Sequence, residues 1–424
     1  MKRYLEKLPV ELKEIINLAA QVSKETGMPA YLVGGFLRDL ILGVPNFDID
    51  ITVEGKGIIF AEKLAKKLKS DLIIHERFGT ATLTLCNCLK LDIATARLEK
   101  YPFCACLPVV SPGSVEEDLM RRDFTINAMA VSLVVADQQK LIDPFDGKDD
   151  LAAGKIRILH DLSFKDDPTR ILRAIRFQQR FDFIIEPKTL ALLKNAIVCG
   201  LLNKVHAHRM RDELVLMLRE KDPSGQMKRL SDLGGLSFLS DKLKFVKSTH
   251  DLFKSLDKGI SWFNKNFSAR RRLDTWLIYF AALLKPLGLA KIKIVISKLG
   301  LRKGEEKRII NYYQQSHKII LYLSKIGMRP SHIFSLLEPL SYEEIILLRS
   351  SSQNRYLKKY IKDFLEIYNG MRPFVSGHDL HGLGILPGPK YKKIFAQVLA
   401  AKLNGEVKSR HQELTLIKKL VKNL

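Results

Sequence analysis

Hydrophobic and polar positions follow two different patterns along the chain, and the change falls near residue 160. Before it, short apolar runs with β-strand spacing occur at 31–33, 47–53, 71–76, 80–86 and 90–96, and helical spacing separates several of them. After it, strand patterns nearly vanish, and helical spacing dominates the segments 168–181, 188–198, 207–220, 271–284, 306–325 and 390–403. The pattern predicts an α+β fold, with an N-terminal mixed α/β head followed by an all-helical rear.

The order of these patterns suggests three parts. Residues 1–150 form the head, which closes in DFTINAMAVSL (123–133) and the turn-rich LIDPFDGKDDL (141–151). Residues 151–220 form a helical neck, and residues 221–424 form a helical body and tail. A chain of 424 residues is too long for one ordinary domain, which agrees with this division.

Charge is distributed unevenly between the front and the rear of the chain. The whole sequence has 70 Lys+Arg and 46 Asp+Glu, a net charge of +24. Residues 1–150 contain 19 Lys+Arg and 22 Asp+Glu, so the positive excess lies in the helical rear. Such a field attracts polyanions, nucleic acid first and anionic membranes second. The asymmetry predicts chemistry in the head and polyanion binding behind it.

Targeting and membrane signals are weak in this sequence. The segment MKRYLEKLPVELKEIINLAAQ (1–21) has the spacing of an amphipathic helix and lacks the unbroken apolar region of a signal peptide. The longest apolar run, WLIYFAALL (276–284), is far shorter than the roughly 18 residues that span a bilayer. We therefore expect a soluble, cytoplasmic protein.

Five cysteines, an odd number in a long chain, argue against a disulfide framework. Cys86 with Cys88, and Cys104 with Cys106, form two C-x-C pairs. Zinc sites usually separate paired cysteines by two to four residues, so one intervening residue is a poor fit. We predict buried or partly buried free thiols at these positions.

The stretch FDIDITVEG (47–55) places Asp48 and Asp50 one residue apart in a predicted strand. Residues i and i+2 of a strand point to the same face, so the two carboxylates repel each other unless a cation lies between them. Hard oxygen ligands suit Mg²⁺, and two carboxylates with substrate phosphates are a usual Mg²⁺ environment. The alternative is a solvated strand edge with both acids in water.

The segment YLVGGFLRDLILG (31–43) lies directly before this pair. A Gly34-Gly35 break between a strand and a helix lets backbone N–H groups approach a phosphate, and the helix N-terminus adds its positive dipole end. Arg38 in the first turn is within reach of the same phosphate. A tight turn without a ligand is the alternative for Gly35 and its neighbour.

Six segments together resemble the tRNA nucleotidyltransferases and the related bacterial poly(A) polymerases, in the DNA polymerase beta superfamily. They are VGGFLRD (33–39), FDIDI (47–51), LDIATARLEKY (91–101), EEDLMRRDFTINAMA (116–130), LIDPFDGKDDL (141–151) and DDPTRILRAIRF (166–177). The likeness is close over roughly residues 30–215 and weaker in SGHDLHGLGILPGPKYKKIF (376–395). It implies a nucleotidyltransferase head, with helical neck, body and tail that bind tRNA.

The resemblance assigns Asp48 and Asp50 to metal ions, here Mg²⁺, that activate the 3′-hydroxyl of tRNA and stabilise the triphosphate of ATP or CTP. Asp92 is a candidate third carboxylate, although an isolated strand aspartate is often merely exposed. The substrates implied are the tRNA 3′ end, ATP and CTP.

The RRDFT motif is implied to bind the nucleotide. By resemblance Arg122 contacts it, and Asp123 and Asn127 are weaker candidates near the ribose. A surface ion cluster is the alternative for this group.

In DDPTRILRAIRF the polar residues Asp167, Arg170, Arg173 and Arg176 recur every three positions on a predicted helix. Asp167 directly precedes Pro168, so helix capping alone could explain it. The family assigns the stripe to base selection: cytosine and adenine each present an amino donor beside a ring-nitrogen acceptor, which a carboxylate and a guanidinium can satisfy together. Arg173 and Arg176 would support the base or the phosphates.

Several alternatives remain at this level. The helix 207–218 is assigned no chemistry, and the basic runs SARRR (268–272) and RKGEEKR (302–308) are expected to bind the tRNA backbone or to be solvated faces. Family members add CCA, only CC or only the final A, and FCAC at 103–106 replaces the proline- and glycine-rich loop of many single enzymes. A poly(A) polymerase and a non-catalytic tRNA-binding protein are the other functions considered. Three His-Asp dipeptides, at 160–161, 250–251 and 378–379, are weak candidates for a hydrolase site.

Overall fold

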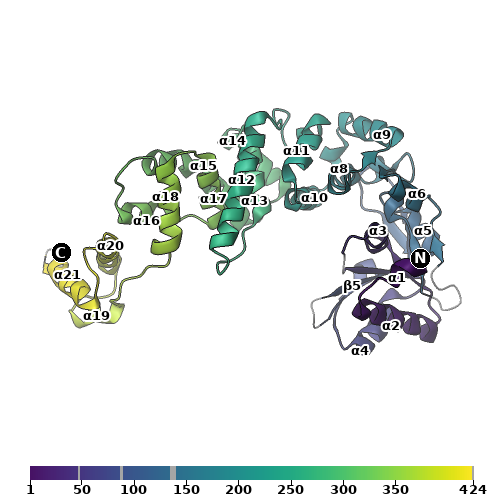
Figure 1. Cartoon of the computed structure of the whole chain (residues 1–424), viewed down its shortest axis with the longest axis horizontal. Helices are drawn as coiled ribbons and strands as arrows, with labels where there is room; N and C mark the ends of the chain where they lie inside the picture. Colours follow the sequence, from purple (N-terminus) through teal and green to yellow (C-terminus); the bar gives the residue numbers. More distant parts are fainter. Residues whose placement is uncertain (46–47, 86–88, 134–139, 423–424) are drawn as a thin grey trace. The chain divides into compact units, whose positions relative to one another are not determined.

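A computed structural model describes residues 1–45, 48–85, 89–133 and 140–422. The chain divides into two compact units, Met1–Phe238 and Leu239–Leu424 (Figure 1). The first contains the strands and the first helices, and the second is helical. The predicted α+β class, with a mixed head and an all-helical rear, is confirmed. The finer boundaries near residues 150 and 220 stay predictions.

A seven-stranded sheet forms the head, in the order β3-β4-β5-β2-β1-β8-β9. The strands are β1 (Ala30–Val33), β2 (Ile49–Val53), β3 (Asp71–His75), β4 (Thr80–Thr84), β5 (Lys90–Thr95), β8 (Ala130–Ser132) and β9 (Leu141–Ile142). Neighbours β2 and β5 run parallel and the other pairs antiparallel. The central strands β2 and β5 are therefore held on both edges, which fixes the register of the aspartates they carry.

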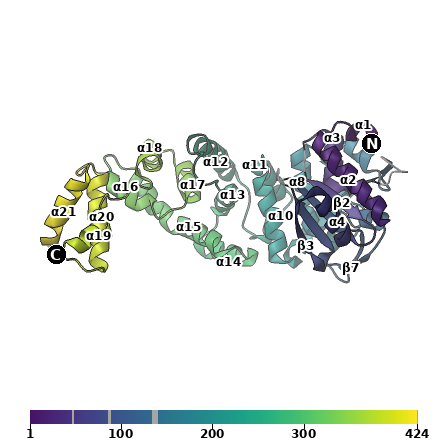
Figure 2. The same ribbon diagram turned by 90° about the horizontal axis from the view of Figure 1, so that it is seen from below.

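Two helices, α2 (Val10–Thr26) and α4 (Gly57–Leu68), pack together against the sheet (Figure 2). In α2 the buried residues Leu12, Ile15, Ala19 and Val22 recur every three or four positions and face the core. The predicted N-terminal helix is interrupted: α1 (Lys2–Leu5) ends before Pro9, and α2 begins at Val10. Proline lacks the N–H that a continuous helix needs, and it suits the position just before a helix start.

A β-hairpin that the hydrophobic pattern did not predict follows β5. It consists of β6 (Arg97–Lys100) and β7 (Val109–Pro112), paired antiparallel from Arg97 opposite Pro112 to Lys100 opposite Val109. Its strands are short, and β7 is exposed throughout, so no alternation of buried and exposed positions marks them. In the connecting loop Cys104 is partly buried and Cys106 is buried, and both thiols are free, as predicted. Cys86 and Cys88 lie outside the described residues.

The remaining elements of the first unit join the sheet to a helical layer. They are α3 (Gly34–Leu42), η1 (Glu76–Phe78), α5 (Val115–Met120), η2 (Thr125–Asn127), α6 (Gly147–Ala152), β10 (Lys155–Ile156), α7 (Ser163–Asp166), α8 (Thr169–Phe181), β11 (Ile184–Ile185), α9 (Pro187–Val198), η4 (Leu201–Lys204), α10 (Ala207–Arg219), α11 (Pro223–Asp232) and η5 (Gly235–Phe238). Helix α8 packs against α10 and α11. Its buried face carries Ile171, Leu172 and Ile175, as the helical spacing predicted.

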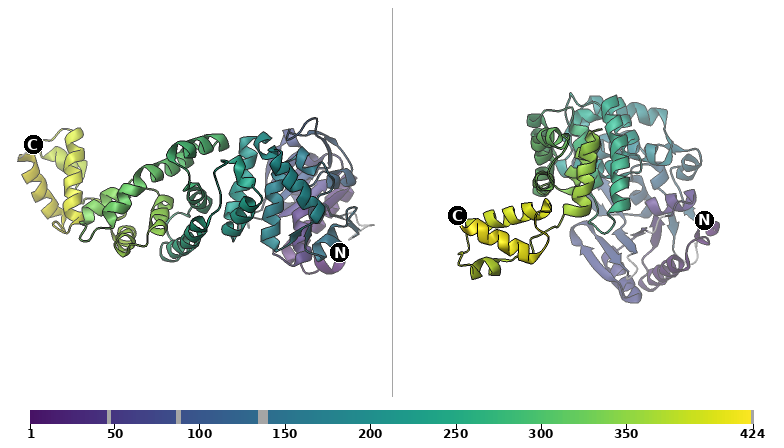
Figure 3. Two further views of the ribbon diagram at one scale, coloured as in Figure 1. Left: turned by 90° about the horizontal axis from the view of Figure 1, so that it is seen from above. Right: turned by 60° about the vertical axis from the view of Figure 1, so that its left-hand side comes forward.

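The second unit, coloured green to yellow in Figure 3, consists of helices. They are α12 (Lys247–Asn266), α13 (Thr275–Leu284), α14 (Leu289–Leu299), α15 (Lys303–Leu323), α16 (Pro330–Leu337), α17 (Tyr342–Ser351), α18 (Arg355–Asp363), η6 (Phe364–Tyr368), α19 (Gly377–Gly382), α20 (Pro389–Leu403) and α21 (Arg410–Lys422). The apolar run 276–284 is buried on all sides in α13. No helix in the described part of the chain is long and apolar enough to cross a membrane.

A buried carboxylate ties three parts of the second unit together. Glu343 Oε1 accepts hydrogen bonds from Arg271 Nη1 (2.7 Å) and the backbone N–H of Asp274 (2.9 Å), while Oε2 accepts from Arg271 Nη2 (2.6 Å). Arg308 Nη1 lies 3.2 Å from Oε2. Although burial opposes ionisation, the Arg271 guanidinium and these hydrogen bonds lower the pKa of Glu343 to about 2.

Glu343→Gln is expected to lower the free energy of unfolding by about 2 kcal/mol at pH 7. The folded pKa is depressed, so the carboxylate stabilises the unit above its ordinary pKa of 4.5, and the stabilisation is lost as pH falls toward 2. The difference between variant and parent should therefore shrink between pH 7 and pH 3 in chemical denaturation. Glu366→Gln is the matched control, because this exposed carboxylate lies 3.8 Å from Lys362 and should matter by less than about 0.5 kcal/mol. A difference that is independent of pH would contradict this account.

Candidate active site

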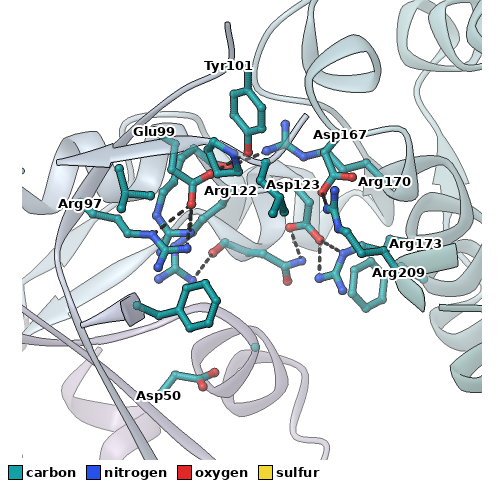
Figure 4. Close-up of a pocket in the computed structure, with 18 of the residues that line it drawn as sticks. Asp50, Arg97, Glu99, Tyr101, Arg122, Asp123, Asp167, Arg170, Arg173 and Arg209 are labelled. Atoms are coloured by element: carbon teal, nitrogen blue, oxygen red, sulfur yellow. Dashed lines mark hydrogen bonds and ion pairs between the residues drawn. The ribbon is translucent and has the colours of Figure 1, made fainter. Parts of the chain in front are cut away.

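A cavity of about 650 Å³ opens in the first unit between the sheet, the β6–β7 hairpin and the helices that follow (Figure 4). Seven residues singled out in the sequence line it: Gly35, Arg38, Asp50, Arg122, Asp167, Arg170 and Arg173. Asp123 and Asn127 line it as well. Asp48 and Arg176 are not among the described residues that form its wall. The cavity therefore brings together side chains separated by more than 100 positions in the chain.

Asp50 lies on β2 directly beside Asp92 of the parallel strand β5. Asp48 is exposed and lies just before β2. Asp92 Oδ1 accepts a hydrogen bond from Thr82 Oγ1 (2.6 Å). The pKa of Asp50 is raised to about 6, chiefly by burial and also by the charges of Asp92 and Asp48, although Arg122 and Arg38 act in the opposite direction. Carboxylates that crowd each other in this way are a suitable oxygen donor set for a hard divalent cation.

The carboxylates of Asp50 on β2 and Asp92 on β5 lie side by side as a pair. In the described ranges, no group of three or more His, Cys, Asp or Glu side chains is close enough to hold a metal ion. Two carboxylates that share a cation with substrate phosphates are nonetheless a usual arrangement for Mg²⁺.

Helix α3 begins at the Gly34-Gly35 pair, at the end of β1. Gly34 has φ +65°, and a Cβ there would lie 2.5 Å from Arg122 Nη1 and 3.7 Å from Asp50 Oδ2. A side chain would thus be strained by the backbone and would displace Arg122. The absence of a Cβ at Gly34 lets the arginine and the aspartate approach the helix start together, where the dipole also favours an anion.

Arg38 is buried, and its guanidinium is held by protein partners. Nε donates to Asp39 Oδ1 (2.8 Å), and Nη1 donates to Asn127 Oδ1 (2.7 Å). Its Cζ lies 5.0 Å and 4.8 Å from the ring centroids of Phe177 and Phe181. These contacts fix the positive charge at the cavity wall and join α3 to η2 and α8.

Asp123 is the centre of a second network. Its Oδ1 accepts from the backbone N–H of Phe124 (2.9 Å) and from Asn127 Nδ2 (2.8 Å), and its Oδ2 accepts from Arg173 Nε (2.8 Å). The charge of Arg173 and these hydrogen bonds hold the pKa of Asp123 at about 2 against the opposing effect of burial. Arg173 Nη1 also donates to Glu213 Oε1 (3.0 Å), which links α8 to α10.

Arg121 and Arg122 project from the end of α5 and share one buried carboxylate. Arg121 Nη2 lies 2.7 Å from Asp118 Oδ1, and Arg122 Nη2 lies 3.0 Å from Oδ2. Arg121 Nη1 also lies 3.2 Å from Glu99 Oε1 on the hairpin. The Nε of Arg122 is buried and has no hydrogen-bond partner in the described part of the protein. Both guanidinium groups face the cavity, where they add positive charge beside Asp50.

Asp167 and Arg170 lie at the start of α8, away from Asp50 in Figure 4. Asp167 Oδ1 accepts from the backbone N–H of Thr169 (3.0 Å), so it performs a capping function, while Oδ2 accepts from Arg209 Nη2 (2.6 Å). Arg170 Nη1 donates to Ser163 Oγ (3.0 Å), and Nη2 donates to the carbonyl of Arg121 (2.6 Å). Asp167 therefore caps the helix and also lines the cavity.

The arginine stripe divides along α8. Arg170 and Arg173 face the cavity, whereas Arg176 is buried between α8 and α10. Arg176 Nη2 lies 3.4 Å from Glu213 Oε2 and Nη1 lies 3.6 Å from Glu220 Oε1. Three residues of an α-helix fall about 60° short of a full turn. Each successive arginine therefore points in a slightly different direction, and Arg176 no longer faces the same way as Arg170.

Sequence reasoning missed two contributions to the cavity. One is Arg209 on α10, a helix that was assigned no chemistry. Glu213 lies four positions later and accepts a hydrogen bond from Arg173, and this i, i+4 spacing was a signal that Arg209 and Glu213 lie on one face of the helix. The other is the hairpin, where Glu99 accepts from Arg97 (2.7 Å) and from the Tyr101 hydroxyl (2.6 Å). Nothing in the local pattern marked β6 as a cavity wall.

Comparison with known proteins identifies the family. Residues 30–157 match the poly(A) polymerase head domain, and residues 182–243 match the probable RNA and SrmB-binding site of polymerase A. The A-adding tRNA nucleotidyltransferase of Halalkalibacterium halodurans is 31% identical over 411 residues, which cover 95% of this chain and 90% of that protein. The chain belongs to the tRNA nucleotidyltransferase family. The resemblance seen in the sequence motifs is thereby confirmed.

Further relatives and solved structures of the tRNA nucleotidyltransferase family are also similar to this chain. The A-adding enzyme of Geobacter sulfurreducens is 35% identical over 98% of this chain, which spans 49% of that relative's length. The Thermotoga maritima CCA-adding enzyme complexed with tRNA shares 33% identity, with a TM-score of 0.75 and coverage of 99% of this chain and 98% of that one. Further relatives are named CC-adding enzymes and multifunctional CCA proteins. Nucleotidyltransferases of this superfamily generally use divalent metal ions.

Proposed function

We propose that the protein is a template-independent nucleotidyltransferase that builds or repairs the CCA terminus of tRNA from CTP and ATP. The observation that carries this proposal is the single cavity that unites Asp50 on the sheet with Arg122 beside the glycine pair and with Asp167 and Arg170 on α8. Such a cavity has room for a nucleotide, and its two groups of polar side chains suit a triphosphate and a base. The names and complexes of the relatives support tRNA as the acceptor.

Asp48 and Asp50 would hold the divalent cations, which we propose to be Mg²⁺. When bound, these ions supply a lowered pKa for the attacking 3′-hydroxyl and neutralise charge on the leaving pyrophosphate. Asp92 lies beside Asp50 in register and could complete the carboxylate set from the neighbouring strand. Burial of Asp50 strengthens its interaction with any cation, because the low dielectric reduces screening.

Gly35, Arg38 and Arg122 would bind the triphosphate. The glycines open the N-terminus of α3, and the two guanidinium groups approach from α3 and from the end of α5. Because Arg38 and Arg122 are oriented by Asn127 and Asp118, they need not be ordered when the nucleotide enters.

Asp167 and Arg170 would select the base, supported by Arg173. A carboxylate accepts the amino group of cytosine or adenine, and a guanidinium donates to the adjacent ring nitrogen, whereas guanine and uracil present the reverse order. Arg209 would orient Asp167 through their 2.6 Å contact. Arg176 would act at a distance, by fixing Glu213 behind Arg173.

Arg209→Ala is expected to raise KM for ATP or CTP about tenfold with kcat changed less than threefold, because Arg209 positions Asp167 and does not contact the reacting atoms. Steady-state kinetics with a tRNA transcript would measure both constants. The control is Arg211→Ala on the same helix, whose guanidinium lies 3.1 Å from Asp212. A loss confined to kcat would contradict a positioning function.

The range of nucleotides added is tested with tRNA transcripts ending at the discriminator base, at C and at CC, each offered labelled CTP or ATP. Extension of all three would indicate a CCA-adding enzyme. Extension of the CC transcript alone, by one A, would indicate the A-adding form, which the names of the Halalkalibacterium and Geobacter relatives favour. Long A tails would favour a poly(A) polymerase, and no extension of any transcript would revive the non-catalytic tRNA-binding protein.

The helical rear would bind the tRNA backbone through its positive excess, including the basic runs at 268–272 and 302–308. A tRNA substrate also accords with the cytoplasmic location predicted from the sequence.

A further inference from the structure

An exposed aromatic ring lines the cavity beside the hairpin. Phe78 belongs to η1, the single turn that joins β3 to β4, and its side chain is 56% exposed although it shares the cavity with Asp50. We infer that Phe78 is a stacking platform for the 3′-terminal base of the RNA acceptor. This inference rests on the proposed function and adds to it a subsite for the acceptor strand.

The turn that carries Phe78 is held rigidly in spite of its exposure. Gly79 ends η1 with φ +60°, and its N–H donates to the carbonyl of Glu76 (3.1 Å). The Gly79 carbonyl accepts from both the backbone N–H (3.0 Å) and the Oγ1 (3.1 Å) of Thr95, at the end of β5. The backbone next to the ring is therefore already ordered, so a base that stacks on the ring does not have to pay for ordering the turn.

The sheet order separates Phe78 from the side chains proposed for the incoming nucleotide. From β2, which carries Asp50, the strands β1 and β8 lie on one side and lead to Gly35 and Asp123. Strands β5 and β4 lie on the other side and lead to Phe78. The 3′-hydroxyl must reach Asp50 while the nucleotide occupies the first side, so the terminal base of the acceptor is the occupant expected on the second.

Charge around the ring suits a strand of RNA. Arg77 Cζ lies 5.6 Å from the Phe78 ring centroid, and Arg77 and Arg97 both line the cavity. Exposed aromatic rings next to cations are the common means by which proteins bind single-stranded nucleic acid, because every base has a face that stacks and every link has a phosphate. The subsite would therefore accept any terminal base and contribute affinity without selecting sequence.

The test is a pair of substitutions assayed on a tRNA transcript that lacks its terminal nucleotide. Phe78→Ala should raise KM for the transcript about tenfold, with KM for ATP changed less than twofold, and Phe78→Trp should restore the parental value. The matched control is Phe103→Ala, which removes a ring that is 71% exposed in the hairpin loop and lies outside the cavity wall. A rise in KM for ATP in place of that for the transcript would overturn the inference, because the ring would then stack on the incoming base.

A second measurement tests whether ring and base contact each other. The acceptor is prepared with 2-aminopurine or with an abasic residue at its 3′ end, and binding is measured without nucleotide. Stacking predicts quenched fluorescence with the parent and recovery with Phe78→Ala, and it predicts that the abasic acceptor binds parent and variant equally. Independent losses from the two changes would overturn the inference. Failure of the proposed function would be recognised separately. In that case the parent protein would extend no acceptor at all, whatever the fluorescence measurement shows.

Discussion

Asp50→Asn is expected to reduce nucleotide incorporation at least about a thousandfold. Asparagine keeps the size of the side chain and removes the charge that a divalent cation needs. Burial and neighbouring carboxylates raise the pKa of Asp50 to about 6, which means that its negative charge is unfavourable in the folded protein. The substitution removes this charge, so the fold should be retained. Single-turnover incorporation into a tRNA transcript at saturating enzyme measures the chemical step directly.

The control for this substitution is Asp71→Asn, on the exposed edge strand β3 of the same sheet. It should incorporate nucleotide at the parental rate. The Asp50 variant should still bind the transcript, because the proposed RNA contacts lie elsewhere, and chelation of divalent cations should abolish incorporation by the parent. An incorporation rate for the Asp50 variant within tenfold of the parental rate would contradict the metal-dependent mechanism.

Asp167→Asn is expected to remove most of the discrimination between bases. An amide can present either a donor or an acceptor, so it no longer enforces the pattern shared by cytosine and adenine. We expect kcat/KM for the normal nucleotide to fall about a hundredfold, and the values for GTP and UTP to change little, so that the preference largely disappears. Competition between labelled nucleotides on one transcript measures this ratio.

Two features make Asp167→Asn interpretable. The side-chain oxygen of asparagine can still accept from Thr169, which preserves the cap of α8, and circular dichroism would verify the fold. Asp166→Asn is the adjacent control, because Asp166 lies outside the cavity wall and 3.8 Å from His160. An equal loss for all four nucleotides would mean that Asp167 supports the helix and does not select bases.

The sequence was sufficient for the features that depend on local spacing. Strand alternation predicted β2, which carries Asp50, and helical spacing predicted the buried side of α8. The common face of Asp48 and Asp50 stays a prediction, because Asp48 lies just before β2. The sequence could not place Asp92, because the register between β2 and β5 depends on the pairing of two distant strands. The ordered motifs supplied that information only through resemblance.

The features missed depend on contacts between distant segments. Arg209 faces the cavity because α10 packs on α8, and no pattern within α10 shows which neighbour its polar face meets. Arg176 has the same spacing as Arg170 and Arg173, yet the pitch of the helix carries it away from the cavity. The hairpin was hidden because β7 is exposed and alternation is the signal by which strands are recognised.

The measurement that tests the central claim most directly offers each of the four nucleotides alone, with Mg²⁺, to the protein and a tRNA transcript lacking part of its CCA end. The cavity predicts extension with ATP, with CTP or with both, and none with GTP or UTP, although no template is present. Extension with all four nucleotides, or with none, would contradict the account.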